Sequence, residues 1–180
     1  MTSRNTLRRE EFRFELRPYD FSCVPDLCKA AVESRKEISP WMAWLHADYN
    51  LQDAANWTAH AIDAWNRQSE YDFVIYDRED GGLIGSCAPN KIDRNNVVCN
   101  LGYWVRTSKR GLGAAPQATL LIKEFGLSVL GLNRLEIVVA DGNKASRRVA
   151  EKAGAHYEGM QRRRIKVADK VYDAHMYALV

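Results

Sequence analysis

The chain has 180 residues, of which 46% are hydrophobic and 27% are charged, and its formal net charge is +3. This length fits a single domain with a full core. No stretch approaches the roughly 20 apolar residues that a membrane-spanning helix needs, so we expect a soluble protein with no membrane partner. A net charge this small gives no indication of direct binding to nucleic acid.

The first ten residues are polar and basic, with no apolar segment behind them. They do not resemble a secretory signal. We expect residues 1–10 to be a disordered or frayed tail and residues 11–180 to form one domain in the cytoplasm. The four cysteines include no CxxC pair and the four histidines no HxxxH or HExxH pair. Reduced thiols are therefore expected, and no metal site.

The predicted elements begin with a strand at residues 12–16, where apolar and polar residues alternate. Helical periodicity predicts helices at residues 24–34 and 52–68. The apolar stripe of the second helix would comprise Ala55, Ala59, Ile62 and Trp65. Between the two helices, Trp41 and Trp44 could either pack in the core at a helix junction or form part of a substrate wall.

Three strands are predicted next, at residues 71–76, 83–88 and 97–105, and turn residues between them favour antiparallel pairing. A long helix at residues 114–130 tolerates Pro116 because a proline fits in a first turn.

The C-terminal part predicts a strand at residues 135–140, a helix at residues 143–153 and two long strands at residues 157–167 and 171–180. The full order is strand, two helices, three strands, helix, strand, helix, two strands. This order indicates an α/β (α+β) fold with about seven strands and about four helices.

Two glycines, Gly111 and Gly113, lie between a predicted strand and a predicted helix. This spacing lets the backbone turn tightly and expose successive N–H groups, and the helix N-terminus adds the positive end of its dipole. Such a junction can hold phosphate groups. The P-loop pattern would need Gly-Lys-Ser/Thr, and the dinucleotide fingerprint would need a third glycine where Pro116 stands. A plain strand-to-helix connection is the alternative.

Residues 101–115, which begin LGYWV and contain both glycines, and residues 141–154, DGNKASRRVAEKAG, resemble the two signature segments of the GNAT superfamily of N-acetyltransferases. Within this superfamily, the two segments resemble more specifically the RimJ/RimL-like branch, which acetylates N-terminal amines of ribosomal proteins. It covers about residues 10–180 and implies the GNAT fold, with a central mixed, mostly antiparallel twisted sheet. It also implies acetyl-CoA as the cosubstrate.

In that family the glycine-rich loop binds the pyrophosphate of CoA through backbone amides. The resemblance assigns this role to Arg110, Gly111, Leu112, Gly113, Ala114 and Ala115. Trp104 and Val105 would lie beside the pantetheine arm, and Asn143 would hydrogen-bond it. Ser146 would point at the thioester sulfur and reprotonate the leaving thiolate, unless it only caps its helix. Tyr172 and Tyr177 are the alternative proton donors.

The general base stays open. Related enzymes often carry an acid where this chain has Asn100, which is not a useful proton acceptor. Asp173, His175, Glu158 or a chain of water molecules could serve instead.

The resemblance implies acetyl transfer to a primary amine, with the N-terminal α-amine of a protein as the favoured acceptor. A small amine is the alternative acceptor, and a non-catalytic acyl-CoA-binding module is the alternative of another class. The basic run at residues 162–164 is either a solvated face or a contact for a phosphate-rich cofactor. The aromatic segment at residues 41–49 and the last strands could form the face of a homodimer.

Overall fold

The computed structural model describes residues 4–180, so residues 1–3 of the expected tail lie outside the described part. The strands are β1 (Phe14–Pro18), β2 (Phe73–Asp77), β3 (Leu83–Asp93), β4 (Val98–Val105), β5 (Arg134–Ala140), β6 (His156–Val167) and β7 (Lys170–Leu179). The helices are α1 (Val24–Glu33), α2 (Arg35–Ile38), α3 (Leu51–Asn66), α4 (Ala114–Glu124) and α5 (Lys144–Lys152). Short helical turns are η1 (Phe21–Cys23), η2 (Thr107–Lys109) and the π-helical η3 (Phe125–Val129).

The strands form one seven-stranded mixed sheet in the order β1-β2-β3-β4-β5-β7-β6. All neighbours pair antiparallel except β4 and β5, which are parallel. This confirms the predicted sheet. In the described chain α2, a single turn, raises the helices to five, where about four were expected.

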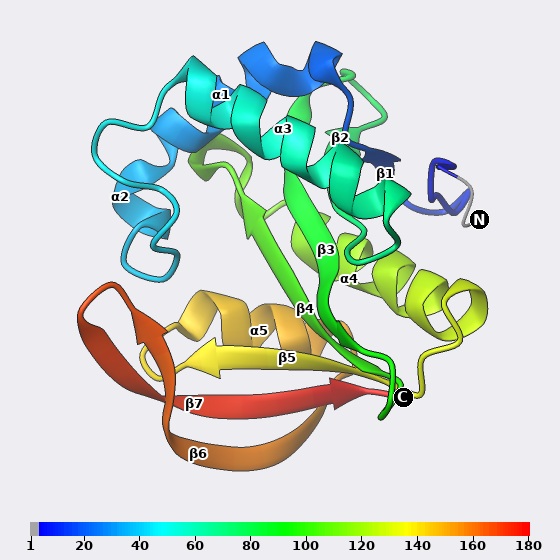
Figure 1. Cartoon of the computed structure of the whole chain (residues 1–180), viewed down its shortest axis with the longest axis vertical. Helices are drawn as coiled ribbons and strands as arrows, with labels where there is room; N and C mark the ends of the chain where they lie inside the picture. Colours follow the sequence, from blue (N-terminus) through cyan, green and yellow to red (C-terminus); the bar gives the residue numbers. More distant parts are fainter. Residues whose placement is uncertain (1–3) are drawn as a thin grey trace.

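The two central strands of the sheet diverge. The parallel pairing joins only residues 98–100 of β4 to residues 134–136 of β5, although both strands continue well beyond these positions. Figure 1 shows β4 and β5 spreading apart from a shared end. The edge of β4 that faces the gap therefore has no β5 partner beyond residue 100, and an unpaired strand edge presents free backbone groups.

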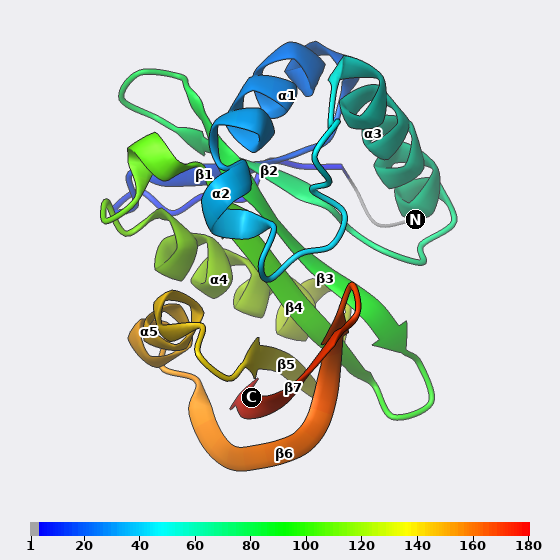
Figure 2. The same ribbon diagram turned by 90° about the vertical axis from the view of Figure 1, so that its left-hand side faces the viewer.

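The sheet has a core on each face. Because successive side chains of a strand point to opposite faces, Phe73 and Ile75 of β2 pack in the core beneath α4. Val74, between them, packs in the second core with α1 and α3. α1 and α3 thus cover one face, while α4 and α5 lie on the other (Figure 2).

An aromatic cluster fixes the C-terminal end of α3 against the sheet. The ring centroids of Trp65 and Phe73 lie 5.0 Å apart, and those of Phe73 and Phe125 lie 5.3 Å apart, both edge-on. Edge-on pairs of this kind stabilise a core beyond the area they bury. The C-terminal end of α3 is therefore fixed to β2 and η3, while its side packs against α1.

The segment ahead of β1 runs beside it. Leu7 exchanges two backbone hydrogen bonds with Leu16, of 2.8 and 2.9 Å, and Arg9 forms an ion pair with Glu124. Within residues 4–180 no helix is both long enough and apolar enough to cross a membrane.

Candidate active site

The glycine-rich loop between β4 and α4 has the backbone conformation that its sequence requires. Gly111 and Gly113 have φ values of +83° and +85°. A β-carbon at either position would meet nothing within 4 Å, so the conformation rather than crowding calls for glycine. The N–H groups of residues 111–115 have no acceptor among residues 4–180, and no side chain caps α4. Free amides at a helix N-terminus attract an anion.

The start of this loop is anchored to the end of α1. Arg106 Nε lies 3.1 Å from Glu33 Oε2, and the Ser108 N–H donates to Glu33 Oε1 at 2.8 Å. The hydrogen bond from Arg106, helped by Ser108, lowers the pKa of Glu33 to about 2. No sequence pattern links Glu33 to a loop so far along the chain, and sequence reasoning missed this anchor.

A first cavity of about 590 Å³ lies between this loop, α2 and α5. It is lined by nearly all of the residues that the resemblance assigned to CoA: Trp104, Val105, Arg110, Gly111, Gly113, Ala114, Ala115, Asn143 and Ser146. Leu112 does not line it, since its side chain is 45% exposed to solvent. We call this space the first cavity.

Cations surround the first cavity. Lys109, Arg110, Arg148 and Lys152 all line it. Arg148 and Lys152 stand four residues apart on α5 and therefore on one side of the helix. Together with the free amides of the loop, these cations suit a ligand that carries several phosphate charges. The sequence analysis singled out only Arg110, because α5 carries basic residues on several of its faces.

Ser146 belongs to a small hydrogen-bonded group at the inner end of the first cavity. Its N–H donates to Asn143 Oδ1 at 3.1 Å, so Asn143 caps α5 as well as lining the cavity. The Ser146 hydroxyl lies 3.0 Å from the Tyr103 hydroxyl, which also lies 3.0 Å from the Ser146 carbonyl oxygen. Burial raises the pKa of Tyr103, which keeps the phenol neutral.

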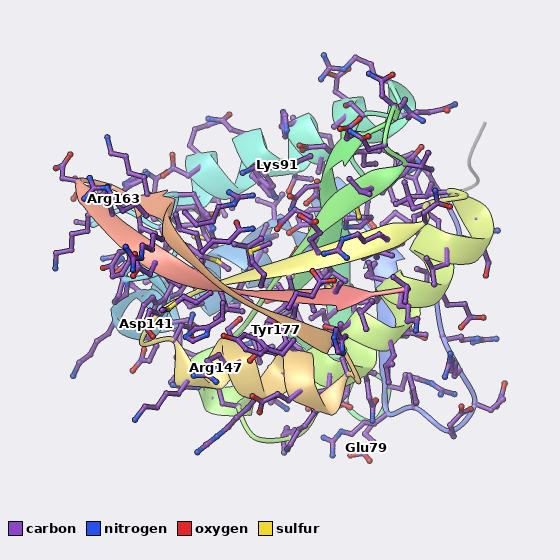
Figure 3. The ribbon with its side chains drawn as sticks, turned by 90° about the horizontal axis from the view of Figure 1, so that it is seen from below. Glu79, Lys91, Asp141, Arg147, Arg163 and Tyr177 are labelled. Atoms are coloured by element: carbon purple, nitrogen blue, oxygen red, sulfur yellow. The ribbon has the colours of Figure 1, made fainter. Side chains whose placement is uncertain are left out.

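The other hydroxyl candidates lie elsewhere. Tyr177 is buried on the side of α5 that faces β7, where it accepts from Arg147 Nε and donates to Glu151, both at 3.3 Å (Figure 3). Tyr172 lies against the Trp41 ring, with centroids 6.1 Å apart. Neither tyrosine lines a cavity described here.

The base candidates of the sequence analysis also lie outside the first cavity, and they do not line the second cavity that is described next. Asp173 Oδ1 accepts the N–H of Arg163 at 2.8 Å, and Glu158 is paired with Arg134. His175 lies between Asp141 and Tyr157, at 3.1 and 3.2 Å. All of them are on or beside β6 and β7, away from the side of β4 that α3 covers.

A second cavity of about 570 Å³ lies on the other side of Trp104, beneath α3. Met42, Tyr103 and Trp104 line both cavities and therefore form their common border. The wall of the second cavity is largely aromatic: Tyr19, Trp44, Tyr49 and Trp57. Trp41 lines the first cavity and Trp44, which is 39% exposed, lines the second; among the described residues neither belongs to a buried core cluster.

The second cavity also contains titratable groups. His46, Asp53, His60, Glu70 and Asp72 line it. Asp72 is only 6% exposed, and its Oδ2 has no hydrogen-bond partner among the described residues. Burial, with a smaller contribution from the charge of Glu70, raises the pKa of Asp72 to about 7. Sequence reasoning missed Asp72, because a single acid before a strand gives no signal until α3 buries it.

The described part of the chain, residues 4–180, contains no group of three or more His, Cys, Asp or Glu side chains that could hold a metal ion. The arrangement instead offers a site for a polyanion beside a site for a cation, with a pair of hydroxyl groups between them.

Comparisons with known proteins agree with this geometry. A family model described as "Acetyltransferase (GNAT) domain" matches residues 13–156. The Bacillus subtilis (strain 168) protein named "Probable N-acetyltransferase YjcK" is 33% identical over 110 residues, which cover 61% of this chain and 60% of that relative. The match thus spans less than two thirds of the relative's length.

Two solved structures share the fold. RimL, a ribosomal L7/L12 alpha-N-protein acetyltransferase in complex with coenzyme A, superposes with a TM-score of 0.88 at 20% identity, covering 98% of each chain. The Microcin C7 self immunity acetyltransferase MccE, in complex with acetyl-CoA and AMP, gives 0.86 at 22% identity, covering 93% of this chain and 92% of MccE. The chain therefore belongs to the GNAT family of acetyltransferases, whose cosubstrate is acetyl-CoA.

Proposed function

We propose that the protein transfers the acetyl group of acetyl-CoA directly to a primary amine, and that its favoured acceptor is the N-terminal α-amine of a protein. One observation carries this proposal: two cavities with opposite chemistry meet at Tyr103 and Trp104. A thioester carbonyl held at that border would be next to an amine held in the second cavity, so the acetyl group could pass directly to the amine without a covalent enzyme intermediate. Holding the two reactants close and correctly oriented supplies much of the rate acceleration.

The first cavity would hold CoA. Its diphosphate would accept from the free amides of residues 111–115, with Arg110 and Arg148 adding charge. The pantetheine arm would run along the unpaired edge of β4 at Trp104 and Val105, and Asn143 would contact it. These roles come from the family resemblance, and the positions of the side chains around the cavity support them.

Acetyl-CoA, when bound, supplies an acyl group activated by its thioester. Attack by the amine forms the C–N bond and breaks the C–S bond, which leaves the electron pair on sulfur. We propose that the Ser146 hydroxyl donates a proton to this sulfur, while Tyr103 orients Ser146 and can resupply the proton.

The RimL fold supports an N-terminal α-amine as acceptor, since RimL is named for that reaction on a ribosomal protein. A small amine is the second candidate. The second cavity favours it because aromatic side chains and three acid groups line it, of which Asp72 is buried, and such a lining suits a compact cation. MccE, which shares the fold and holds AMP, is a precedent for a small ligand.

Two measurements test the proposal. Calorimetry should show saturable binding of acetyl-CoA. If no such binding is detected, the proposal is wrong. Release of CoA thiol is then followed with a panel of amines: peptides with a free N-terminal Ala, Ser or Met, free amino acids, spermidine and kanamycin. The peptides should give the highest kcat/KM. Faster turnover of a small amine would favour the second candidate, and tight binding without transfer would indicate a non-catalytic module.

A further inference from the structure

The second cavity contains one acid group that the structure leaves unsatisfied. Asp53 Oδ2 accepts the N–H of Asn50 at 2.9 Å and lies 3.6 Å from His46, and Glu70 lies 3.6 Å from His60. Asp72, in contrast, is 6% exposed and its Oδ2 has no partner among residues 4–180. A buried carboxyl group without a partner carries a desolvation cost, so its presence in a cavity points to a ligand.

The sheet register places Asp72 one row away from Tyr103, which lies at the border between the cavities. Phe73 pairs with Cys87, and Cys87 pairs with Tyr103. Asp72, one residue before Phe73, therefore lies in the same row as Ala88 and Gly102, which pair with each other and line the second cavity. Two strand spacings separate Asp72 from Gly102, which is about 10 Å. Between Asp72 and Gly102 this row holds only the methyl group of Ala88, and the Asn90 side chain lies beside Gly102, so the cavity here is lined by small and polar groups that suit an amine or a water molecule.

From this placement we propose that Asp72 is the general base of acetyl transfer, receiving the proton of the acceptor's ammonium group directly or through one water molecule. The inference rests on the proposed function, because it needs an amine acceptor. It replaces Asp173, His175 and Glu158, which lie outside the cavities. It also accounts for catalysis without an acid at Asn100, whose Nδ2 donates to Asn90 Oδ1 at 2.9 Å.

The protons and electrons balance with Asp72 in this role. The ammonium gives one proton to the Asp72 carboxylate, and the neutral amine attacks the thioester carbon. The C–N bond forms, the C–S bond breaks and sulfur keeps the electron pair. The nitrogen then loses a second proton while the sulfur gains one from the Ser146 hydroxyl, which takes up the nitrogen's proton through Tyr103 or water. Asp72 releases its proton to solvent before the next turnover.

The charges around Asp72 suit proton transfer near neutral pH. The titratable groups coupled to it are Glu70 beside it, His60 of α3, Tyr19 ahead of η1 and Cys87 of β3, while Lys91 of β3 lines the same cavity. Burial and the charge of Glu70 raise the pKa of Asp72 to about 7, while His60 acts in the opposite direction. A base works best when its pKa is close to the working pH.

The main test is the pH profile of Asp72→Asn, which keeps the shape of the side chain and removes the base. The probe is the panel amine with the highest kcat/KM for the unaltered protein. At pH 7 kcat/KM should fall by about 10²–10⁴-fold, and the acidic limb near pH 7 should disappear, leaving only the ionisation of the amine itself. Acetyl-CoA affinity should not change. Asp63→Asn, on the outer side of α3, is the matched control and should retain the full rate.

A second variant keeps the test decisive if Asp72→Asn does not fold. Glu70→Gln removes the like charge beside Asp72, so the acidic limb of kcat/KM should move to lower pH. Unchanged rates and unchanged profiles in both variants would overturn the assignment of Asp72 and leave the proposed function standing. An unaltered protein that binds acetyl-CoA but acetylates no amine of the panel would overturn the proposed function and Asp72 with it.

Discussion

The hydroxyl groups of Ser146 and Tyr103 lie 3.0 Å apart, although the residues are separated by 43 positions in the chain. Ser146 is on α5, which packs against β5, and Tyr103 is on β4, so the contact spans the gap where β4 and β5 diverge. Tyr103 also borders both cavities. The contact thus places two exchangeable protons at the position where the cavities meet.

Ser146→Ala should lower kcat while leaving acetyl-CoA binding within about threefold, because a missing proton donor affects the leaving step; general acids contribute about 10²–10⁴-fold. Steady-state kinetics and calorimetry measure the two quantities. Ser128→Ala, at an exposed position on η3, is the control. Tyr103→Phe should also lower kcat, and the double variant should lose less than the product of the single losses, since the two hydroxyls act as a unit. A kcat unchanged by Ser146→Ala would show that this serine only caps and solvates its helix.

Gly113→Glu should abolish acetyl-CoA binding. The residue has φ of +85°, which an L side chain rarely adopts, and the new carboxylate would stand among the amides that are free to bind an anion. Val129→Glu is the matched control, because it adds the same charge on η3 at a residue that is 58% exposed and lines neither cavity. Calorimetry should show binding of the control within a few-fold of the unaltered protein. An equal loss of acetyl-CoA binding in both variants would indicate a general effect of the added negative charge rather than binding of the diphosphate by the loop amides.

The sequence predicts the glycine-rich loop between β4 and α4 well, because that loop depends on local backbone conformation. Strand, loop and helix follow one another over residues 98–124, and the two glycines with positive φ mark the turn between them. The order of strands along the chain and the mixed sheet are confirmed for the same reason. Periodicity and turn residues report such local features directly.

Features that depend on burial by distant elements were missed or misplaced. The buried face of α3 comprises Ala54, Thr58, Ala61, Ala64 and Trp65, whereas Ala59 is exposed and the predicted stripe was wrong there. Alanines on several sides of the helix make its stripe ambiguous. Thr58 can be buried because its hydroxyl donates to the Ala54 carbonyl at 2.9 Å. Similarly, β3 continues through Pro89 to Asp93, because it keeps pairing with β4 there, Pro89 with Leu101 and Asn90 with Asn100.

Arg148→Gln should raise the Kd for CoA by about 10- to 100-fold, since a charge-assisted hydrogen bond contributes about 1.5–3 kcal/mol. It should also weaken the salt dependence of binding. The neighbouring Arg147→Gln is the control, because Arg147 points toward Tyr177 rather than into the first cavity (Figure 3). Calorimetry at two salt concentrations measures both effects. Equal weakening by the two variants would contradict a specific role for the cavity-lining face of α5.

Glu33→Gln should destabilise the protein by about 1 kcal/mol at pH 7, a figure reduced for partial exposure to solvent. Arg106 and Ser108 lower the pKa of Glu33 from 4.5 to about 2. The stabilisation is therefore complete above pH 4.5 and is lost as the pH falls through 2. Thermal unfolding should show a Tm a few degrees lower at neutral pH, with the difference vanishing toward pH 2. Exposed Glu10→Gln is the control, and a pH-independent difference would show that the loop anchor is not electrostatic.

Asp72→Asn should gain stability relative to the unaltered protein as the pH rises. Burial raises the pKa of Asp72 from 3.8 to about 7, so the folded state holds a proton that the unfolded chain has released. Below pH 3.8 Asp72 is protonated in both the folded and the unfolded state, and the full free energy of unfolding is present. As the pH rises from 3.8 to 7 the free energy of unfolding of the unaltered protein falls progressively, because only the unfolded chain releases this proton readily. Between pH 5 and 8.5 the free energy of unfolding of the variant, relative to the unaltered protein, should rise by about 2–3 kcal/mol. Denaturant unfolding at the two pH values measures this change, with Asp63→Asn as the control.

Parallel pH curves for the two proteins would mean that Asp72 finds a partner in solution, and an already paired carboxylate could not take a proton from an amine. A rising difference would instead show that the fold keeps an uncompensated carboxyl group at the floor of the second cavity. Such a group weakens the folded state over the same pH interval in which it becomes able to accept a proton. The pH dependence of the free energy of unfolding and that of kcat/KM should consequently change slope at the same pH, because both follow the ionisation of one side chain.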